Sequence, residues 1–148
     1  MDEHSIIVLK NVGPKGYPGM PEVGNTPLPK KLLEKGVTDM IRISDGRMSG
    51  TAYGAVVLHV APEAAVGGTF AIVQDGDMIE VNVPERKLNL LVDETEIIQR
   101  KSTWKLEEKT YHRGYVGIYQ QFVNQANKGA DLDILVGTSG PNIDRDGF

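Results

Sequence analysis

The sequence predicts a mainly β domain with helices packed on it, either a curled sheet or a swivelling β/β/α-type barrel. Three observations support this prediction. Apolar runs with β-branched residues recur at 6–9, 40–43, 56–60 and 78–83, and their shortness favours strands over helices. Stretches rich in glycine and proline separate several of these runs. The chain of 148 residues is long enough for one domain with a hydrophobic core and too short for two of ordinary size.

The first part of the chain predicts strands that lead into glycine-rich loops. The strand at 6–9 runs into a long loop over 11–27, where glycines and prolines prevent a helix or a ladder from continuing. Thr26 is expected to cap a short helix that ends at Gly36. The strand at 40–43 leads into the loop SDGRMSGTAYG, which begins at Ser44. Irregular loops held by rigid strands are a common way to build a binding site.

The middle of the chain predicts further strands. The run at 56–60 is followed by segments at 69–73, 78–83 and 87–92. The turn sequences QDGD and VPER separate these last three segments, so we expect a three-stranded meander.

The C-terminal part predicts two helices and a tail. Asp93 is expected to cap the first helix, which has acidic residues in its first turn. Apolar residues recur at helical spacing from Tyr115 to Val123, and Gly129 is expected to close this second helix. The tail at 138–148 is rich in glycine, serine, aspartate and asparagine and is expected to be loose.

Composition excludes several classes of function. The formal net charge of -4 gives no basic field for a nucleic-acid partner. No apolar run approaches the length of a membrane span, and the N-terminus is acidic where a secretory signal would be basic, so we expect a cytoplasmic protein without a membrane partner. The chain has no cysteine, which excludes disulfides and any iron–sulfur or zinc site held by its own thiolates.

The loop SDGRMSGTAYG holds three candidate functional residues. Ser49 has no histidine near it in the sequence, and its surroundings do not match the Gly-x-Ser-x-Gly elbow. Such a serine usually satisfies nearby backbone groups in a turn, whereas a catalytic role would need an activator from elsewhere. Arg47 could clamp a carboxylate or phosphate, or it could brace its loop. Thr51 could bind a substrate hydroxyl or hold the turn.

Two further residues are of types that can bind a metal ion. Glu22 lies in GMPEVGN, a loop of glycine, proline and small apolar residues. It could be a surface glutamate, or it could supply the hard oxygen ligand that magnesium prefers. His59 lies inside the apolar segment VVLHVA and is expected to be a core residue, because one histidine without a partner makes no metal site.

Several long motifs are shared with one enzyme family. The stretches GPKGYPGMPEVGNTPLP, ISDGRMSGTAYGAVVLHVAPEAAVGG and VQDGDMIEVNV, with RKSTW and GADLDILVG, resemble the C-terminal domain of the dihydroxy-acid dehydratase and 6-phosphogluconate dehydratase family. Three stretches are more similar to the sugar-acid branch, the arabinonate and xylonate type dehydratases, than to the branched-chain amino-acid enzyme. They are RMSGTAYG, NTPLPKKLL and GADLDILVG.

The resemblance implies a function for these residues. The family removes water from 2,3-dihydroxy acids to give 2-keto-3-deoxy acids and uses a magnesium ion and an iron–sulfur cluster. By this resemblance Ser49 is the base that removes the C2 proton and Glu22 is a magnesium ligand. Arg47 and Thr51 are the candidate substrate-binding residues, and the alternative for each is to hold its loop. A serine hydroxyl is a weak acid, so nearby metal charge would have to lower its pKa before it could serve as a base.

The resemblance also implies that residues 1–148 are a C-terminal fragment. The family's cluster cysteines and other magnesium ligands lie in a longer N-terminal region, which we expect to be a partner of this chain, with a sugar-acid substrate and a homo-oligomeric assembly. The chain alone is expected to be inactive. The alternative is a stand-alone module for binding small anions or a partner protein, which keeps the scaffold without catalysis and in which Arg47 would anchor a carboxylate or phosphate.

Overall fold

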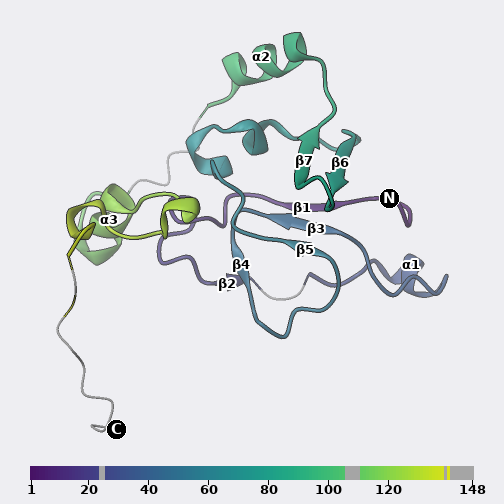
Figure 1. Ribbon diagram of the computed structural model, residues 1–148, viewed down its shortest axis with the longest axis horizontal. Helices are drawn as coiled ribbons and strands as arrows, with labels where there is room; N and C mark the ends of the chain where they lie inside the picture. The colour runs from purple at the N-terminus through teal and green to yellow at the C-terminus, as the bar shows by residue number, and fades with distance from the viewer. Residues whose placement is uncertain (24–25, 106–110, 139, 141–148) are drawn as a thin grey trace, which may run out of the picture.

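The computed structural model describes residues 1–23, 26–105, 111–138 and 140. Its centre is a parallel sheet of β1 (Ile7–Leu9), β3 (Arg42–Ser44) and β5 (Val56–Val57), in the order β1-β3-β5 (Figure 1). The middle strand β3 is buried along its whole length, including the polar side chains of Arg42 and Ser44. In register, Ile43 pairs with Val8 on one side and Val57 on the other.

The core forms where Ile43 packs against residues that follow the sheet. Ile43 is only 2% exposed and clusters with Ala64, Phe70 and Ala71. These three residues lie in two short 3-10 helices, η1 (Ala64–Val66) and η2 (Thr69–Ile72).

The expectation of a strand at 69–73 is wrong because this segment is helical. The residues Phe70, Ala71 and Ile72 are all buried in succession, whereas a strand would alternate them between two faces. The turn before them allows this: Gly67 has φ +80°, and the Ala71 N–H donates to the Gly68 carbonyl at 2.9 Å. A 3-10 turn keeps its backbone hydrogen bonds local and can therefore bury three neighbouring side chains together.

The predicted meander is a two-stranded hairpin. Strand β6 (Ile79–Asn82) pairs antiparallel with β7 (Lys87–Leu90), with Ile79 opposite Leu90. A third, parallel pair joins β2 (Glu22–Val23) to β4 (Arg47–Met48). These three sheets are separate. The described residues thus form a mixed domain of sheets and helices without a closed barrel, and the barrel form of the predicted fold is not confirmed.

The three α-helices lie at the periphery of the sheets in Figure 1, and they are α1 (Lys30–Leu33), α2 (Glu94–Thr103) and α3 (Gly114–Phe122). The cap position of α1 is Pro29 and not Thr26, and Asp93 makes no side-chain capping bond to α2. Two 3-10 helices, η3 (Ala126–Lys128) and η4 (Asp133–Leu135), follow α3. Gly129 closes η3, not α3, and does so in the left-handed conformation with φ 101°.

A bidentate ion pair joins α2 to the turn before β6. The Arg100 guanidinium donates to both carboxylate oxygens of Asp77, at 2.6 and 3.0 Å, and also to the Ile72 carbonyl. These bonds hold the pKa of the Asp77 carboxyl below its usual range.

No helix among the described residues is long and apolar enough to cross a bilayer. Of the predicted loose tail, 138–148, only Thr138 and Gly140 are described.

Candidate functional site

The two glycine-rich loops meet at the β2–β4 pair. Glu22 is in register with Arg47, and Val23 is in register with Met48. Ser49 is the next residue after β4. With a strand spacing of about 4.8 Å and a rise of about 3.3 Å per residue, the Cα atoms of Glu22 and Ser49 are about 8 Å apart. The structure therefore brings together two residues that the sequence places in different loops.

Ser49 begins a tight turn that engages its hydroxyl. The Ala52 N–H donates to the Ser49 carbonyl at 2.9 Å and closes the turn. The Ser49 Oγ lies 3.0 Å from the Thr51 Oγ1 and accepts the Thr51 N–H at 3.3 Å. This pattern is a serine turn of the kind that satisfies local backbone. Thr51 is exposed and Ser49 is half-buried, so the hydroxyl pair lies at the surface.

Arg47 braces the loop that carries Glu22. Its Nε donates to the Met20 carbonyl at 2.7 Å, and Met20 is a buried residue with a left-handed φ of 45°. Arg47 also pairs with Glu22 through the β2–β4 ladder. These contacts favour the bracing role among the two that the sequence left open.

Asp45 anchors the start of the same loop. Its carboxylate is 0% exposed and accepts three backbone N–H groups, from Asn11 at 3.1 Å, Val12 at 3.0 Å and Ala64 at 2.9 Å. The first two donors belong to the loop that leads to Glu22, and the third belongs to η1. Asp45 therefore joins three segments that are distant in the sequence.

Glu63 anchors the loop a little further along. It is 1% exposed and accepts the N–H groups of Lys15 at 3.0 Å and Gly16 at 2.8 Å. The Gln125 side chain completes the arrangement, since its amide donates to the Glu63 carboxylate at 2.7 Å and accepts the Glu63 N–H at 2.8 Å. Glu63 thus connects the glycine-rich loop to the segment after α3.

α3 itself lies within electrostatic range of these groups. Burial raises the pKa of the Tyr119 hydroxyl, and the negative charge of Glu63 raises it further while the positive charge of Arg47 opposes the effect. Gln120 of α3 also contacts the glycine-rich loop, because its side-chain amide donates to the Lys15 carbonyl at 3.2 Å. The helix is therefore joined to the loop through Gln120 and Lys15.

A buried arginine fixes the far end of the Ser49 loop. The Arg42 side chain is 5% exposed and donates to the carbonyls of Thr26, Met40 and Tyr53. It also pairs with the Asp39 carboxylate at 3.3 Å. The loop 44–54 is thus held at its start by β3 and at its end by Arg42.

Sequence reasoning missed Asp45, Glu63 and Arg42. The signal that could have found them is their context, because Arg42 lies between two isoleucines in IRIS, Asp45 directly follows β3 in ISDG, and Glu63 follows a proline in the otherwise apolar VAPEAA. Charged residues among such neighbours are seldom buried unless they are paired.

His59 is not the core residue that the sequence predicted. Its side chain is exposed and its backbone is left-handed, with φ 56°. The His59 N–H donates to the Gly46 carbonyl at 3.1 Å. The strand β5 ends at Val57, so His59 lies in the loop after the strand, where its side chain can turn outward.

The residues present fit only part of a magnesium site. Glu22 offers an exposed carboxylate, and Mg²⁺ is commonly held by one or two carboxylates with water and substrate completing its shell. Over the residues that the structure describes, no group of three or more histidine, aspartate or glutamate side chains could hold a metal ion. The absence of cysteine leaves no thiolate for an iron–sulfur cluster.

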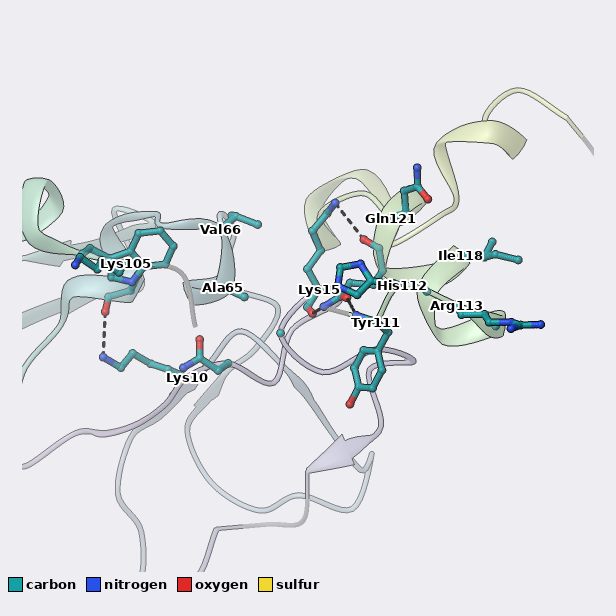
Figure 2. Close-up of a pocket in the computed structure, with 17 residues that line it drawn as sticks. Lys10, Lys15, Ala65, Val66, Lys105, Tyr111, His112, Arg113, Ile118 and Gln121 are labelled. Carbon is teal, nitrogen blue, oxygen red and sulfur yellow. Dashed lines mark hydrogen bonds between the residues drawn. The ribbon is translucent and has the colours of Figure 1, made fainter. Parts of the chain in front are cut away.

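A separate cavity of about 1030 Å³ lies between α3 and the region of η1 and Trp104 (Figure 2). Lys10 donates to the carbonyls of Ala71 and Val73 at 3.1 and 2.9 Å, and Lys15 donates to the Gln120 carbonyl at 3.4 Å. Residues 106–110, which follow Lys105 at its border, lie outside the described residues. None of the four predicted site residues lines this cavity, so the predicted site is the surface at β2 and β4.

The exposed carboxylate of Glu22 and the hydroxyl-bearing turn at Ser49 thus lie on two firmly held loops, and binding residues are often found on such loops. Comparison with known proteins identifies the family. Residues 1–130 match the family model described as dihydroxy-acid/6-phosphogluconate dehydratase C-terminal, and the chain belongs to this family.

The similarity extends to named enzymes. The chain is 54% identical over 146 residues to an L-arabinonate dehydratase of Rhizobium leguminosarum, and 53% identical over 131 residues to a 6-deoxy-6-sulfo-D-gluconate dehydratase of Pseudomonas putida. It is 41% identical over 133 residues to a dihydroxy-acid dehydratase of Archaeoglobus fulgidus. These matches cover 99%, 88% and 89% of this chain but only 25%, 23% and 24% of the relatives. The chain therefore spans a quarter or less of their length.

Proposed function

We propose that this chain supplies the base and one magnesium ligand of a hydro-lyase that converts 2,3-dihydroxy sugar acids to 2-keto-3-deoxy acids. The observation that carries the proposal is the parallel pairing of β2 with β4, which sets Glu22 beside the strand that Ser49 directly follows. The relatives named for sugar acids are more similar to this chain than the dihydroxy-acid dehydratase cited above, and this supports a sugar-acid substrate.

The chain's own residues divide the chemistry between them. Ser49, as the alkoxide, takes the proton from C2 of the substrate. The electron pair of the broken C2–H bond forms the C2–C3 double bond as the C3–O bond breaks. The departing hydroxide takes up the proton that Ser49 removed and leaves as water, which restores the serine alkoxide. The resulting enol tautomerises to the keto acid, because its C2 hydroxyl loses a proton while C3 gains one. Thr51, whose Oγ1 lies 3.0 Å from the Ser49 Oγ, orients the serine oxygen.

Glu22 is the residue of this chain that would hold Mg²⁺. When bound there, the ion supplies positive charge that acidifies the serine hydroxyl and stabilises negative charge on the substrate carboxylate. Further ligands, and the thiolates of any iron–sulfur cluster, would have to come from another part of the enzyme, because this chain has no cysteine.

A chimera tests the proposal directly. In this experiment the chain replaces the matching segment of the L-arabinonate dehydratase of Rhizobium leguminosarum, and formation of a keto acid from L-arabinonate is measured with and without Mg²⁺. We expect the chimera to be active and Ser49→Ala to lower its kcat by about 10²–10⁴-fold, the usual contribution of a positioned base. The matched control is Ser102→Ala, which removes an exposed hydroxyl bonded only to the Gln99 carbonyl in α2 and should leave the rate unchanged.

The alternative function predicts a different set of results. The turn that engages the Ser49 hydroxyl with Thr51 is equally compatible with a module that binds small anions and catalyses nothing. In that case the chimera would be inactive although folded, and the isolated chain would bind carboxylates or phosphate in a manner that Arg47→Ala abolishes. An active chimera in which Ser49→Ala keeps the full rate would refute the assignment of the base.

A further inference from the structure

We propose that Asp45 and Glu63 are positioning residues, which fix the loop carrying Glu22 relative to the loop carrying Ser49. This inference rests on the proposed function, because it assigns a role toward that site. It concerns two buried carboxylates that touch neither substrate nor metal in the proposal, and whose bonds all go to backbone and to Gln125.

The two carboxylates need their backbone partners. A buried carboxylate is costly unless its charge is met by strong hydrogen bonds or a counter-ion. Among the described residues, the ion pairs involve neither Asp45 nor Glu63. Their charges are met by the N–H groups of Asn11, Val12 and Ala64 for Asp45, and of Lys15 and Gly16 for Glu63. Because each carboxylate depends on these donors, the donors are in turn held in place.

The anchors divide the loop into short spans. Asp45 holds its first two residues, Glu63 holds it near Gly16, and Arg47 holds the Met20 carbonyl two residues before Glu22. Only Gly46 separates Asp45 from Arg47, which is the first residue of β4, and Ser49 directly follows that strand. A shift of one loop is therefore passed to the other through residues that belong to both contacts.

The two loops and the residues that anchor them are closely packed. A Cβ added at Gly13 would lie 2.7 Å from the Glu63 Oε2, and one added at Gly46 would lie 2.7 Å from the Val12 Cγ2. At the two ends of the anchored loop, Asn11 and Met20 have left-handed φ values of 64° and 45°. Non-glycine residues keep such conformations only where the surrounding contacts impose them, and here those contacts are the bonds from Asp45 and Arg47.

The first test measures the geometry in the isolated chain. Asp45→Asn and Glu63→Gln keep the side-chain shape, but each turns an amide N–H₂ toward a backbone donor. NMR contacts across β2–β4, between Glu22 and Arg47, should weaken or vanish in both variants. Contacts across β1–β3 should persist and show that the core is folded. The matched control is Asp77→Asn, which alters a carboxylate with 8% side-chain exposure that pairs with Arg100 of α2. This control should leave the β2–β4 contacts intact, because α2 and β2 lie on opposite sides of the central sheet in Figure 1.

The second test uses the active chimera. We expect Asp45→Asn and Glu63→Gln to raise the Mg²⁺ concentration for half-maximal rate by about 10- to 100-fold, as loss of the groups that orient metal ligands commonly does. Asp77→Asn should leave this concentration unchanged. If a variant loses the β1–β3 contacts, Gln125→Ala replaces it, because this change removes one partner of Glu63 and no bond to the loop. It should raise the Mg²⁺ requirement in a folded chain.

The outcomes separate this inference from the proposed function. If Ser49→Ala loses activity while the two carboxylate variants keep both the β2–β4 contacts and the wild-type Mg²⁺ requirement, the positioning inference is overturned and the proposed function stands. If Ser49→Ala remains fully active, the proposed function fails, and the NMR contacts in the isolated chain decide whether Asp45 and Glu63 set the loop geometry.

Discussion

Replacing Gly13 with alanine tests the closest approach between the glycine-rich loop and the residues that anchor it. The added Cβ would lie 2.7 Å from the Glu63 Oε2, 3.0 Å from the Glu63 Cβ and 3.1 Å from the Asp45 carbonyl oxygen. Ordinary van der Waals contact begins at 3.4 Å. Two of these three neighbours are backbone or lie next to it, so they cannot swing aside as the end of a flexible side chain could. Gly13 itself has no positive φ, so the effect of the substitution is steric and not conformational.

The expected magnitude follows from this overlap. Forcing an extra methyl group into a filled site costs about 1–3 kcal/mol of unfolding free energy. For a chain of about 150 residues each kcal/mol lowers Tm by about 2–4 °C, so we expect a decrease of about 2–12 °C. Gly50→Ala is the matched control, since an added Cβ there meets nothing within 4 Å and the residue has no positive φ.

Thermal and urea unfolding of the isolated chain would measure both variants against the wild type. We expect Gly13→Ala to shift the midpoint without changing the urea m-value, and Gly50→Ala to behave as the wild type. Equal stability of the two variants would show that Glu63 is not packed against the loop, and the account of the anchored loop would then be wrong.

Two further predictions concern the core and the α2 ion pair. Ile43→Ala should lower the unfolding free energy by about 2–5 kcal/mol because it leaves a cavity at the centre of the core, whereas Ile98→Ala at an exposed position of α2 should change it little; similar losses in urea unfolding would contradict the assigned core. The folded-state pKa of Asp77 lies below its usual range because of Arg100, so its contribution is complete above about pH 5 and is lost as the pH falls through the folded-state pKa. The stability gap between wild type and Asp77→Asn should therefore narrow in acid unfolding curves, and a gap independent of pH would contradict this ion pair.

The parts of the fold that could be predicted are those with strong local signals. Predicted strands at 6–9 and 40–43 are close to β1 and β3, and the hairpin of β6 and β7 follows its alternating pattern. Helix α2 lies where the sequence predicted it, although Asp93 makes no side-chain capping bond. Helix α3 begins where the apolar spacing predicted a helix but ends at Phe122, well before Gly129. The segment 69–73 misled the prediction, because an apolar run that a strand would bury on two faces can also be buried by a 3-10 turn after two glycines.

The residues of the candidate site also divide into those with a local sequence signal and those without one. Glu22 and Ser49 could be proposed as candidates because a carboxylate or serine in a glycine-rich loop is visible in the sequence itself. Asp45 and Glu63 were missed because their roles depend on partners that lie 19 to 62 residues away along the chain. His59 was misplaced because its apolar neighbours predicted a strand that in fact ends at Val57. Local pattern thus identifies candidates for chemistry, whereas the residues that orient them emerge only from tertiary contacts.

The buried carboxylates also bear on the choice between a half-site and an inert module. Burying an ion costs several kcal/mol after relaxation, and replacing such groups with apolar residues is often neutral or stabilising. A scaffold that had only to fold would gain little from two such groups on the loop that leads to Glu22. A site that must hold Glu22 at a set distance from Ser49 would gain a defined loop geometry from both. The placement of Asp45 and Glu63 is therefore what the proposed half-site would require.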